Sequence, residues 1–416
     1  MMLPGGDAPS DQPSDRGKPI VRLAARGDGA TADGRFVVGA AVGDHVRFDG
    51  DRVTILPGPD HVTPVCRHFP DCGGCQLQHV SDAAYGDFVV DRIVRALGHA
   101  GVAIGQVMPL ALSPPRSRRR ASLRAVRRAG VLALGFNAEG SHRIVDITQC
   151  EVLTPALFTL IAPLRRLLNA LVREGQGAGV TLTETDAGVD VLLANVVADG
   201  LDAIQRLTGF AAAQDLARLS VEGAQGVETV ALARQPLLTF GGVVVAPPPA
   251  PFLQATREGE AALVAAVGDA VGDARRVADL FCGLGTFALP ISKTARVVAA
   301  DAAGPAVAAL EAAVRQSGRH VATSHRDLFR RPLTAVELAV FDAVVFDPPR
   351  PGAQAQTAQI AASKVPVVVA VSCNPSTFAR DASILVEGGY RLDRLWPVAQ
   401  FRWSTHVELV ARFVRP

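Results

Sequence analysis

The chain has 416 residues, of which 49% are hydrophobic, and its formal net charge at pH 7 is only +2. This length allows two or three domains with sizeable cores, and the small charge excludes a protein that is strongly basic throughout. No apolar run reaches the length of a membrane span, and the first residues lack the charged and apolar regions of a signal peptide. We therefore expect a cytoplasmic protein with no membrane partner, whose six cysteines are reduced.

The N-terminal part of the chain changes character near residue 18. Residues 1–17 are rich in Gly, Pro, Ser and Asp and are expected to be disordered. Short β-patterned runs alternate with Asp-Gly turns from there to residue 56. They predict a small β-barrel over residues 18–59.

A cluster of cysteines follows the predicted barrel. Cys66, Cys72 and Cys75 lie close together, and Cys150 is more distant in the sequence. In a reducing compartment such a cluster indicates metal binding or catalysis before disulfides. Four thiols can hold either tetrahedral zinc or an iron–sulfur cluster, and the spacing matches neither a zinc ribbon nor a bacterial ferredoxin. The spacing therefore leaves the metal open.

The next segments predict an α+β middle domain over residues 60–245. A helix is expected over 81–97, with Ser81 or Asp82 as its cap and Gly98 as its stop. Further helices are predicted over 155–173 and 201–218, and strands over 131–136, 142–147 and 180–197.

Seven of the thirteen residues from 116 to 128 are arginines, and none of the others is acidic. Such a segment can be simply a solvated surface. In a nearly neutral chain, however, it creates a local positive field, which favours a nucleic-acid backbone as the partner.

The C-terminal part predicts a doubly wound α/β domain over residues 246–416. A proline-rich stretch at 246–251 forms a stiff linker, and strands and helices then alternate regularly. The predicted strands are 276–281, 296–301, 320–326, 341–347, 365–372, 391–397 and 406–413. The predicted helices are 257–270, 284–293, 304–317, 353–363 and 376–387.

A glycine loop stands at the end of the first strand of this domain, in Asp-Leu-Phe-Cys-Gly-Leu-Gly-Thr-Phe at 279–287. Gly283 and Gly285 permit a tight turn and a close approach of the backbone to a ligand. Asp301 ends the next strand, where an acidic side chain can bind ribose hydroxyls. The pattern predicts a nucleotide cofactor, either a dinucleotide or S-adenosylmethionine; the alternative is fold architecture alone.

Cys373 is predicted to lie where a buried strand ends and a helix begins. Asn374 suits the helix N-cap and Pro375 the first helical position. Open α/β sheets bind ligands at this edge, and a helix N-terminus favours a thiolate. Asp347, in an Asp-Pro-Pro turn, is expected to line the same pocket, and Glu408 on the last strand is a candidate general base. The alternative for Cys373 is a buried, inert cysteine.

These motifs in combination resemble the RNA uracil-5-methyltransferases. The matching residues are Cys-x5-Cys-Gly-Gly-Cys-x-Leu-Gln-His from Cys66, Asp347-Pro-Pro-Arg, Ser372-Cys-Asn-Pro and His406-x-Glu408. The resemblance covers about 20–413 and is closest to the branch acting on 23S ribosomal RNA, which carries a TRAM barrel and a [4Fe-4S] cluster. It implies a Rossmann-like class I S-adenosylmethionine-dependent domain, preceded by a TRAM/OB-like barrel and a central iron–sulfur and RNA-binding domain.

The resemblance also implies a reaction and its residues. Cys373 would add to carbon 6 of a uridine in 23S rRNA, carbon 5 would take the methyl group, and Glu408 would remove the carbon-5 proton, giving 5-methyluridine. The implied cofactor-binding residues are Gln254, Phe281, Gly283, Gly285, Thr286, Asp301, Asp327 and Asp347. The implied cluster ligands are Cys66, Cys72, Cys75 and Cys150, which favours iron–sulfur over zinc. We expect a monomer.

The chain departs from the family pattern at several points, and three alternatives stay open. The barrel region is short and poor in Lys and Arg, Asp301 stands where relatives often have Glu, and Thr286 stands where some have Asn. The alternatives are the same chemistry on the T-loop uridine of tRNA, cytosine-5 methylation, and a non-catalytic iron–sulfur RNA-binding protein. Relatives acting on tRNA often lack the cluster, and in cytosine enzymes the proline precedes the nucleophile, whereas Pro375 follows it.

Overall fold

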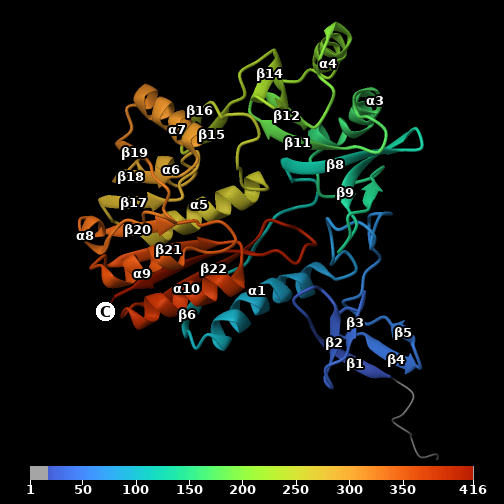
Figure 1. Ribbon diagram of the computed structural model, residues 1–416. Helices are drawn as coiled ribbons and strands as arrows, with labels where there is room; N and C mark the ends of the chain where they lie inside the picture. The colour runs from blue at the N-terminus through green and yellow to red at the C-terminus, as the bar shows by residue number, and fades with distance from the viewer. Residues whose placement is uncertain (1–16, 416) are drawn as a thin grey trace, which may run out of the picture.

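The computed structural model describes residues 17–415, so residues 1–16 of the stretch predicted to be disordered lie outside the described residues. Figure 1 shows a small β-unit at one end, a middle unit with its own sheet, and a layered α/β unit. Over the described residues, no helix combines the length and the apolar character that a membrane crossing needs.

The N-terminal unit is a five-stranded antiparallel sheet in the order β3-β2-β1-β4-β5. Its strands are β1 (Lys18–Leu23), β2 (Gly29–Thr31), β3 (Phe36–Val37), β4 (His45–Asp49) and β5 (Arg52–Leu56). The β-pattern of this region is thus confirmed, and its identity as a TRAM barrel stays a prediction. The core is small, with Ile20, Val37, Ala40 and Val46 at its centre.

Helix α1 (Asp82–His99) connects the N-terminal unit to the α/β unit. The Ser81 hydroxyl caps it by accepting a hydrogen bond of 3.2 Å from the Ala84 amide, as predicted. The helix passes through Gly98, the predicted stop, and is capped by Ala100. Its apolar face packs against the α/β unit beside α10, as Figure 1 shows.

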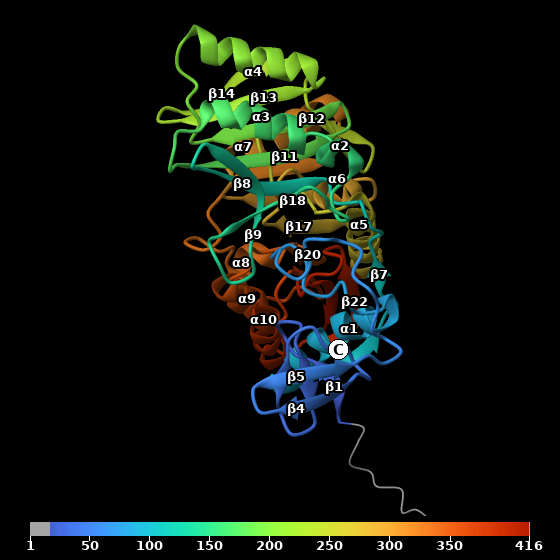
Figure 2. The same ribbon diagram turned by 90° about the vertical axis from the view of Figure 1, so that its right-hand side faces the viewer.

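The middle unit is a seven-stranded sheet in the order β10-β9-β8-β11-β12-β13-β14, and α3 and α4 pack on one of its faces (Figure 2). Its strands are β8 (Arg120–Arg128), β9 (Val131–Asn137), β10 (Ile144–Asp146), β11 (Gly177–Thr185), β12 (Gly188–Ala194), β13 (Arg218–Gly223) and β14 (Gly226–Leu232). Its helices are α2 (Pro155–Phe158), α3 (Ile161–Leu171) and α4 (Leu201–Ala213).

The strands expected over 180–197 are present as the hairpin of β11 and β12, whereas two helix predictions for the middle unit are wrong in detail. The helix expected over 155–173 is divided into α2 and α3. The helix expected over 201–218 ends at Ala213, because residue 218 already begins the hairpin of β13 and β14. Periodicity alone did not locate these turns, since the apolar residues on both sides face the same core.

All seven strands predicted for the α/β unit are present. They are β17 (Arg276–Leu280), β18 (Arg296–Asp301), β19 (Val321–His325), β20 (Ala343–Phe346), β21 (Val367–Ser372), β22 (Arg391–Ala399) and β23 (Glu408–Val414). The helices are α5 (Arg257–Val271), α6 (Ala288–Ile291), α7 (Gly304–Ser317), α8 (Ala335–Leu338), α9 (Gln354–Ala362) and α10 (Pro375–Glu387). The predicted helix over 284–293 is reduced to α6, α8 was not expected, and a short hairpin, β15 (Leu238–Phe240) and β16 (Val243–Val245), precedes the unit.

The α/β sheet has the order β19-β18-β17-β20-β21-β23-β22-β6. The first five strands are parallel, and β23 runs antiparallel between β21 and β22. Helices cover both faces, so the central strand β20 is buried along its whole length. The carboxyl ends of the parallel strands and the start of β23 therefore meet at one edge of the sheet, beside the switch point between β17 and β20.

Two strands from before the middle unit complete this sheet. β6 (Ile104–Val107) and β7 (Ala111–Leu112) both pair with β22. The chain then leaves for the middle unit and returns before α5, and the outgoing and returning segments touch. The Ser113 and Thr256 hydroxyls are 2.7 Å apart, and the Arg119 amide donates to the Ala255 carbonyl at 2.9 Å.

Candidate active site

Cys373 lies at the junction between β21 and α10, as the sequence predicts. The Asn374 side chain caps α10 by accepting from the Ser376 amide at 3.1 Å, and Pro375 is the first residue of the helix. Leu409 of β23 pairs with Ser372 of β21. This register places Glu408 next to the strand end that carries Cys373, although the two residues are far apart in the sequence.

The electrostatics of this junction differ from the expectation for a helix N-terminus. Burial, together with the carboxylates of Glu408 and Asp347, raises the pKa of the Cys373 thiol to about 12, and Arg350 opposes this shift only in part. Glu408 is only 5% exposed, and burial and Asp347 raise its pKa well above the usual value. Burial and the neighbouring carboxylates therefore oppose the thiolate form that a helix N-terminus favours, and the thiol form of Cys373 is favoured in the free protein.

Asp347 follows β20 at the same edge. Burial, with Asp301 as a second cause, raises its pKa to about 7. The Gln254 amide nitrogen lies 3.5 Å from an Asp347 carboxylate oxygen. Arg350 closes the same turn, and its guanidinium contacts the His406 ring at 3.1 Å. Arg350 was not singled out in the sequence, although it is the last residue of the Asp-Pro-Pro-Arg motif.

Gln400 is a second residue that the sequence analysis missed. Its side chain is 2% exposed and hydrogen-bonds Gln254 at 2.7 Å. It also hydrogen-bonds the Glu408 side chain, which opposes the upward shift of the Glu408 pKa. No motif pointed to it, because it stands in an irregular segment between β22 and β23.

The glycine loop follows β17 and is tied to the end of β18. Asp301 accepts hydrogen bonds from the Gly283 amide at 2.9 Å and from the Ala303 amide at 2.7 Å. Gly283 has a φ of +51°, and a Cβ built there would point into open space. Gly285 has a φ of +90°, and its Cβ would come within 2.6 Å of Leu310. Gly283 thus leaves room for a ligand, whereas Gly285 is required by packing.

The other predicted cofactor residues surround this loop. Phe281 adopts a positive φ of 64°, which is a strained conformation for a large side chain. Its ring lies 5.5 Å from the ring of Phe329. Asp327 fixes that neighbouring loop by accepting from the Phe329 and Arg330 amides at 3.0 and 3.2 Å. Thr286 is half-buried in the glycine loop itself.

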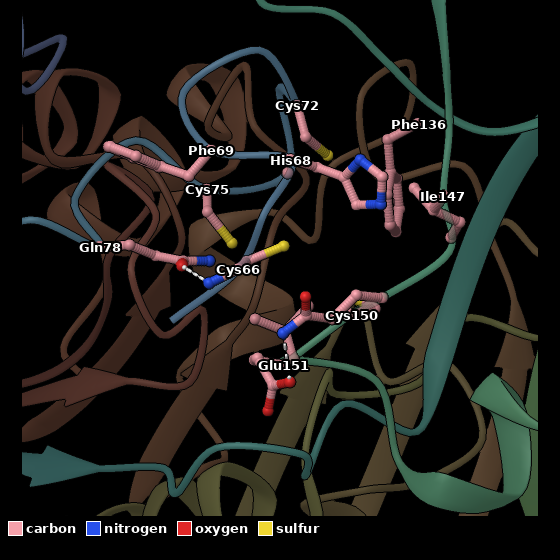
Figure 3. Close-up of a pocket in the computed structure, with 13 residues that line it drawn as sticks. Cys66, His68, Phe69, Cys72, Cys75, Gln78, Phe136, Ile147, Cys150 and Glu151 are labelled. Carbon is pink, nitrogen blue, oxygen red and sulfur yellow. Dashed lines mark hydrogen bonds between the residues drawn. The ribbon is translucent and has the colours of Figure 1, made fainter. Parts of the chain in front are cut away.

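The four clustered cysteines line one cavity between the 66–78 loop and the segment that ends at Cys150. The cavity has an empty volume of about 350 Å³, and Figure 3 shows the Cys66, Cys72 and Cys75 sulfurs turned toward the same space. Across residues 17–415, no group of three or more His, Cys, Asp or Glu side chains is arranged to hold a metal ion. The metal prediction is therefore not confirmed, although the cysteines are gathered together.

Five of the seven arginines in the arginine segment fall into two sets. Arg116, Arg119 and Arg127 have carboxylate partners in Glu151, Glu260 and Glu174. Arg119 is 2% exposed and also donates to the Gln254 carbonyl, so it anchors the segment before α5 and is not available to an external partner. Arg124 and Arg128 are exposed on β8 and line a broad surface hollow together with Arg143. Only part of the predicted positive field therefore faces solvent.

The raised thiol pKa leads to a direct prediction. We expect iodoacetamide to modify Cys373 slowly near neutral pH, with a rate that still rises above about pH 9, because only the thiolate reacts. Mass spectrometry of the peptide that carries Cys373 measures this rate, and urea-denatured protein, whose thiols titrate near about 8.5, is the control. If the rate for the native protein reached its plateau at a lower pH than the rate for the denatured control, this result would contradict the raised pKa.

Known proteins share both the sequence and the fold. The family model described as tRNA (Uracil-5-)-methyltransferase matches residues 254–412. A Zymomonas mobilis protein named as an uncharacterized RNA methyltransferase is 44% identical over 398 residues, which cover 96% of this chain and 100% of that protein. The 23S rRNA (uracil(1939)-C(5))-methyltransferase of Aeromonas salmonicida is 30% identical over 368 residues, covering 86% of this chain and 84% of that protein.

One solved structure matches almost the whole fold. It is the Pyrococcus abyssi tRNA (uracil-54, C5)-methyltransferase in complex with S-adenosyl-L-homocysteine, with a TM-score of 0.72 over 95% of this chain and 99% of that one. Its identity to this chain is 22%, so the match bears on the fold and confirms the class I methyltransferase architecture. With the near full-length relatives and the matched motifs, the chain belongs to the RNA (uracil-5-)-methyltransferase family of S-adenosylmethionine-dependent enzymes.

Proposed function

We propose that this enzyme methylates carbon 5 of a uridine in 23S rRNA through a covalent adduct between Cys373 and carbon 6. The observation that carries the proposal is the sheet edge at which Cys373, Glu408 and Asp347 meet beside the glycine loop. The Aeromonas relative supports 23S rRNA as the substrate, and the tRNA enzyme of known structure keeps tRNA as the alternative. We further propose that the protein acts as a cytoplasmic monomer.

In the proposed reaction, each residue acts on a defined bond. The Cys373 sulfur, its proton lost to solvent, bonds to carbon 6, and the electrons of the 5,6 double bond move onto carbon 5 and the adjacent carbonyl. Carbon 5 then bonds to the electrophilic methyl group that S-adenosylmethionine would supply, and the electrons of the broken carbon–sulfur bond stay on the sulfur of the S-adenosylhomocysteine that leaves. Glu408 then takes the carbon-5 proton, the double bond re-forms, and the thiolate is expelled. The uridine must be flipped out of its RNA context to reach Cys373.

The proposed cofactor pocket is built around the glycine loop. The open space over Gly283 and the fixed carboxylate of Asp301 fit an adenosine moiety at the end of β18. Asp347 and Gln254 lie between this loop and Cys373, where the methyl group must pass. The residues proposed to bind the cofactor are Gln254, Phe281, Gly283, Gly285, Thr286, Asp301, Asp327 and Asp347.

We also propose that Cys66, Cys72, Cys75 and Cys150 hold a [4Fe-4S] cluster. All four thiols border the same cavity, and the Arg118 guanidinium lies near Cys75 and Cys150, where it would offset the charge of thiolate ligands. An iron–sulfur cluster holds its cysteine ligands farther apart than a single metal ion does. The four cysteines are not arranged to hold a single ion, and this finding does not argue against a cluster. Methyl transfer needs no redox step, so the cluster would join the 66–78 loop to the middle unit. The N-terminal sheet would serve as a TRAM-type RNA contact.

The nucleophile assignment is tested by Cys373→Ala. We expect methyl transfer to fall by at least about 10³-fold, as for other enzymes that lose their nucleophile, while S-adenosylmethionine still binds. Mapping of 5-methyluridine in 23S rRNA and tRNA from cells lacking the gene, complemented with each variant, measures the outcome. The matched control is Ser376→Ala, at an exposed position in the first turn of α10. Methylation that survives in Cys373→Ala would refute the covalent mechanism.

The cluster is tested by its metal content. Protein purified without oxygen is expected to be brown and to contain about four iron atoms per chain. Cys150→Ser should lower the iron content, whereas Cys282→Ala, which removes a buried thiol from the α/β core, should leave it unchanged. A colourless protein that contains zinc would contradict the proposal.

The exposed arginines of β8 are expected to contact phosphates. Replacing both Arg124 and Arg128 by Ala should weaken RNA binding and reduce the slope of log K against log salt by about 0.7–0.9 for each phosphate that is no longer neutralised. Binding is measured by fluorescence anisotropy at several salt concentrations. Arg206→Ala is the control, because Arg206 lies on α4 and pairs with Asp202. An unchanged salt slope in the double variant would exclude this surface.

A further inference from the structure

Gln400 joins two residues that the proposed reaction uses. Its amide nitrogen donates to the Gln254 side-chain oxygen at 2.7 Å, and Gln254 in turn lies 3.5 Å from Asp347. On the other side, the Gln400 amide hydrogen-bonds the Glu408 carboxylate. Gln254 and Gln400 are 4% and 2% exposed, so water does not compete for these contacts. The two amides form a continuous path between the two carboxyl groups.

The direction of this path is fixed by one backbone group. The Ala255 amide donates to the Gln400 side-chain oxygen at 2.8 Å. Because a backbone N–H can only donate, the Gln400 oxygen must face Ala255, and its NH₂ group must face Gln254 and Glu408. The Gln254 oxygen then accepts, which leaves its own NH₂ group for Asp347. Each carboxyl group therefore receives an amide N–H.

The positions of these groups are set by rigid elements. Glu408 pairs with Val398 across β22 and β23, and Gln400 directly follows the end of β22 at Ala399. Ala255 is held by the Arg119 amide, which donates to its carbonyl at 2.9 Å. Arg119 is itself paired with Glu260 of α5. The amide that orients Gln400 is thus fixed by both the middle unit and the α/β unit.

We infer that Gln400 is a positioning residue, which aims one N–H at the Glu408 carboxylate and, through Gln254, orients a second N–H toward Asp347. This inference rests on the proposed roles of Glu408 and Asp347. A hydrogen bond to the charged form favours that form, so Gln400 keeps a buried base able to accept a proton. Among the described residues, Gln400 alone has a side-chain amide that contacts both Glu408 and Gln254, the residue that leads to Asp347.

Loss of the Gln400 amide should change the pH dependence of the reaction. The charged and titratable groups that face Glu408 are Asp347, Arg350 and Cys373. Burial and Asp347 raise the Glu408 pKa, and the Gln400 and Arg350 contacts lower it. Removing the Gln400 N–H must therefore raise this pKa further. Because the base acts only when deprotonated, the acid limb of the kcat profile should move to higher pH.

The test uses Gln400→Met, which keeps the volume of the side chain and removes the amide. We expect kcat near neutral pH to fall by about 10- to 100-fold, the range that the loss of a hydrogen bond to a charged group produces. The decrease should shrink as the pH rises, and KM for the RNA should change far less than kcat. Transfer of a tritiated methyl group from S-adenosylmethionine to 23S rRNA measures both constants. The rRNA is isolated from cells lacking the gene.

Two further variants separate positioning from stability. Gln400→Glu keeps an acceptor for the Ala255 amide, so the fold is preserved, yet when ionised it offers no N–H and should shift the acid limb in the same direction. Gln356→Met removes a fully buried glutamine that hydrogen-bonds only Leu333. It should lower thermal stability and leave the pH profile unchanged.

The outcomes separate a failure of the proposed function from a failure of the role given to Gln400. If the wild-type protein does not methylate uridine, the proposed function is wrong, and this outcome is visible from the wild-type protein alone. If the wild-type protein is active and both Gln400 variants keep its pH profile, Gln400 is only a packing residue and the inference is wrong. An upward shift of the acid limb in both Gln400 variants, absent from Gln356→Met, is the expected result.

Discussion

The pairing of β21 with β23 is the contact on which the active site depends. Cys373 and Glu408 are 35 residues apart in the sequence, and the register of Ser372 with Leu409 brings them together. The parallel strands before β21 already deliver their loops to this edge of the sheet. An antiparallel strand inserted beside β21 must begin where β21 ends, so its first residue reaches the same place. The sheet topology therefore assembles the site before any side chain makes a specific contact.

Burial dominates the chemistry of the assembled site. Cys373, Asp347 and Glu408 all have a raised pKa, because three groups that become negative share a poorly hydrated space with a single nearby guanidinium, that of Arg350. Burial therefore favours the thiol form of Cys373 in the free protein. Because the thiolate is the reactive form, this arrangement disfavours the reaction of Cys373 with small electrophiles. It also makes neutral hydrogen-bond donors such as the two glutamine amides valuable, since they stabilise a carboxylate without adding a further titrating group.

The sequence predicted the strands of the α/β unit well and the middle unit less well. Buried runs such as Val367–Ser372 are unambiguous, because helices cover both of their sides. In the middle unit, the break between α2 and α3 leaves the apolar pattern unchanged and was missed. The arginines could not be sorted from sequence, since whether Arg119 meets Glu260 or solvent depends on long-range packing. Gln400 lay outside every motif, and only the hydrogen-bond network revealed it.

The middle unit is inserted into the α/β unit rather than appended to it. The outgoing segment near Ser113 and the returning segment near Thr256 lie against each other, joined by hydroxyl and backbone hydrogen bonds. A domain held by two adjacent segments can swing about the line through them, but it cannot twist freely as it could on a single linker. Gln254 and Ala255 belong to the returning segment, so the stretch of backbone that carries the middle unit also carries the two residues that contact the Gln400 side chain.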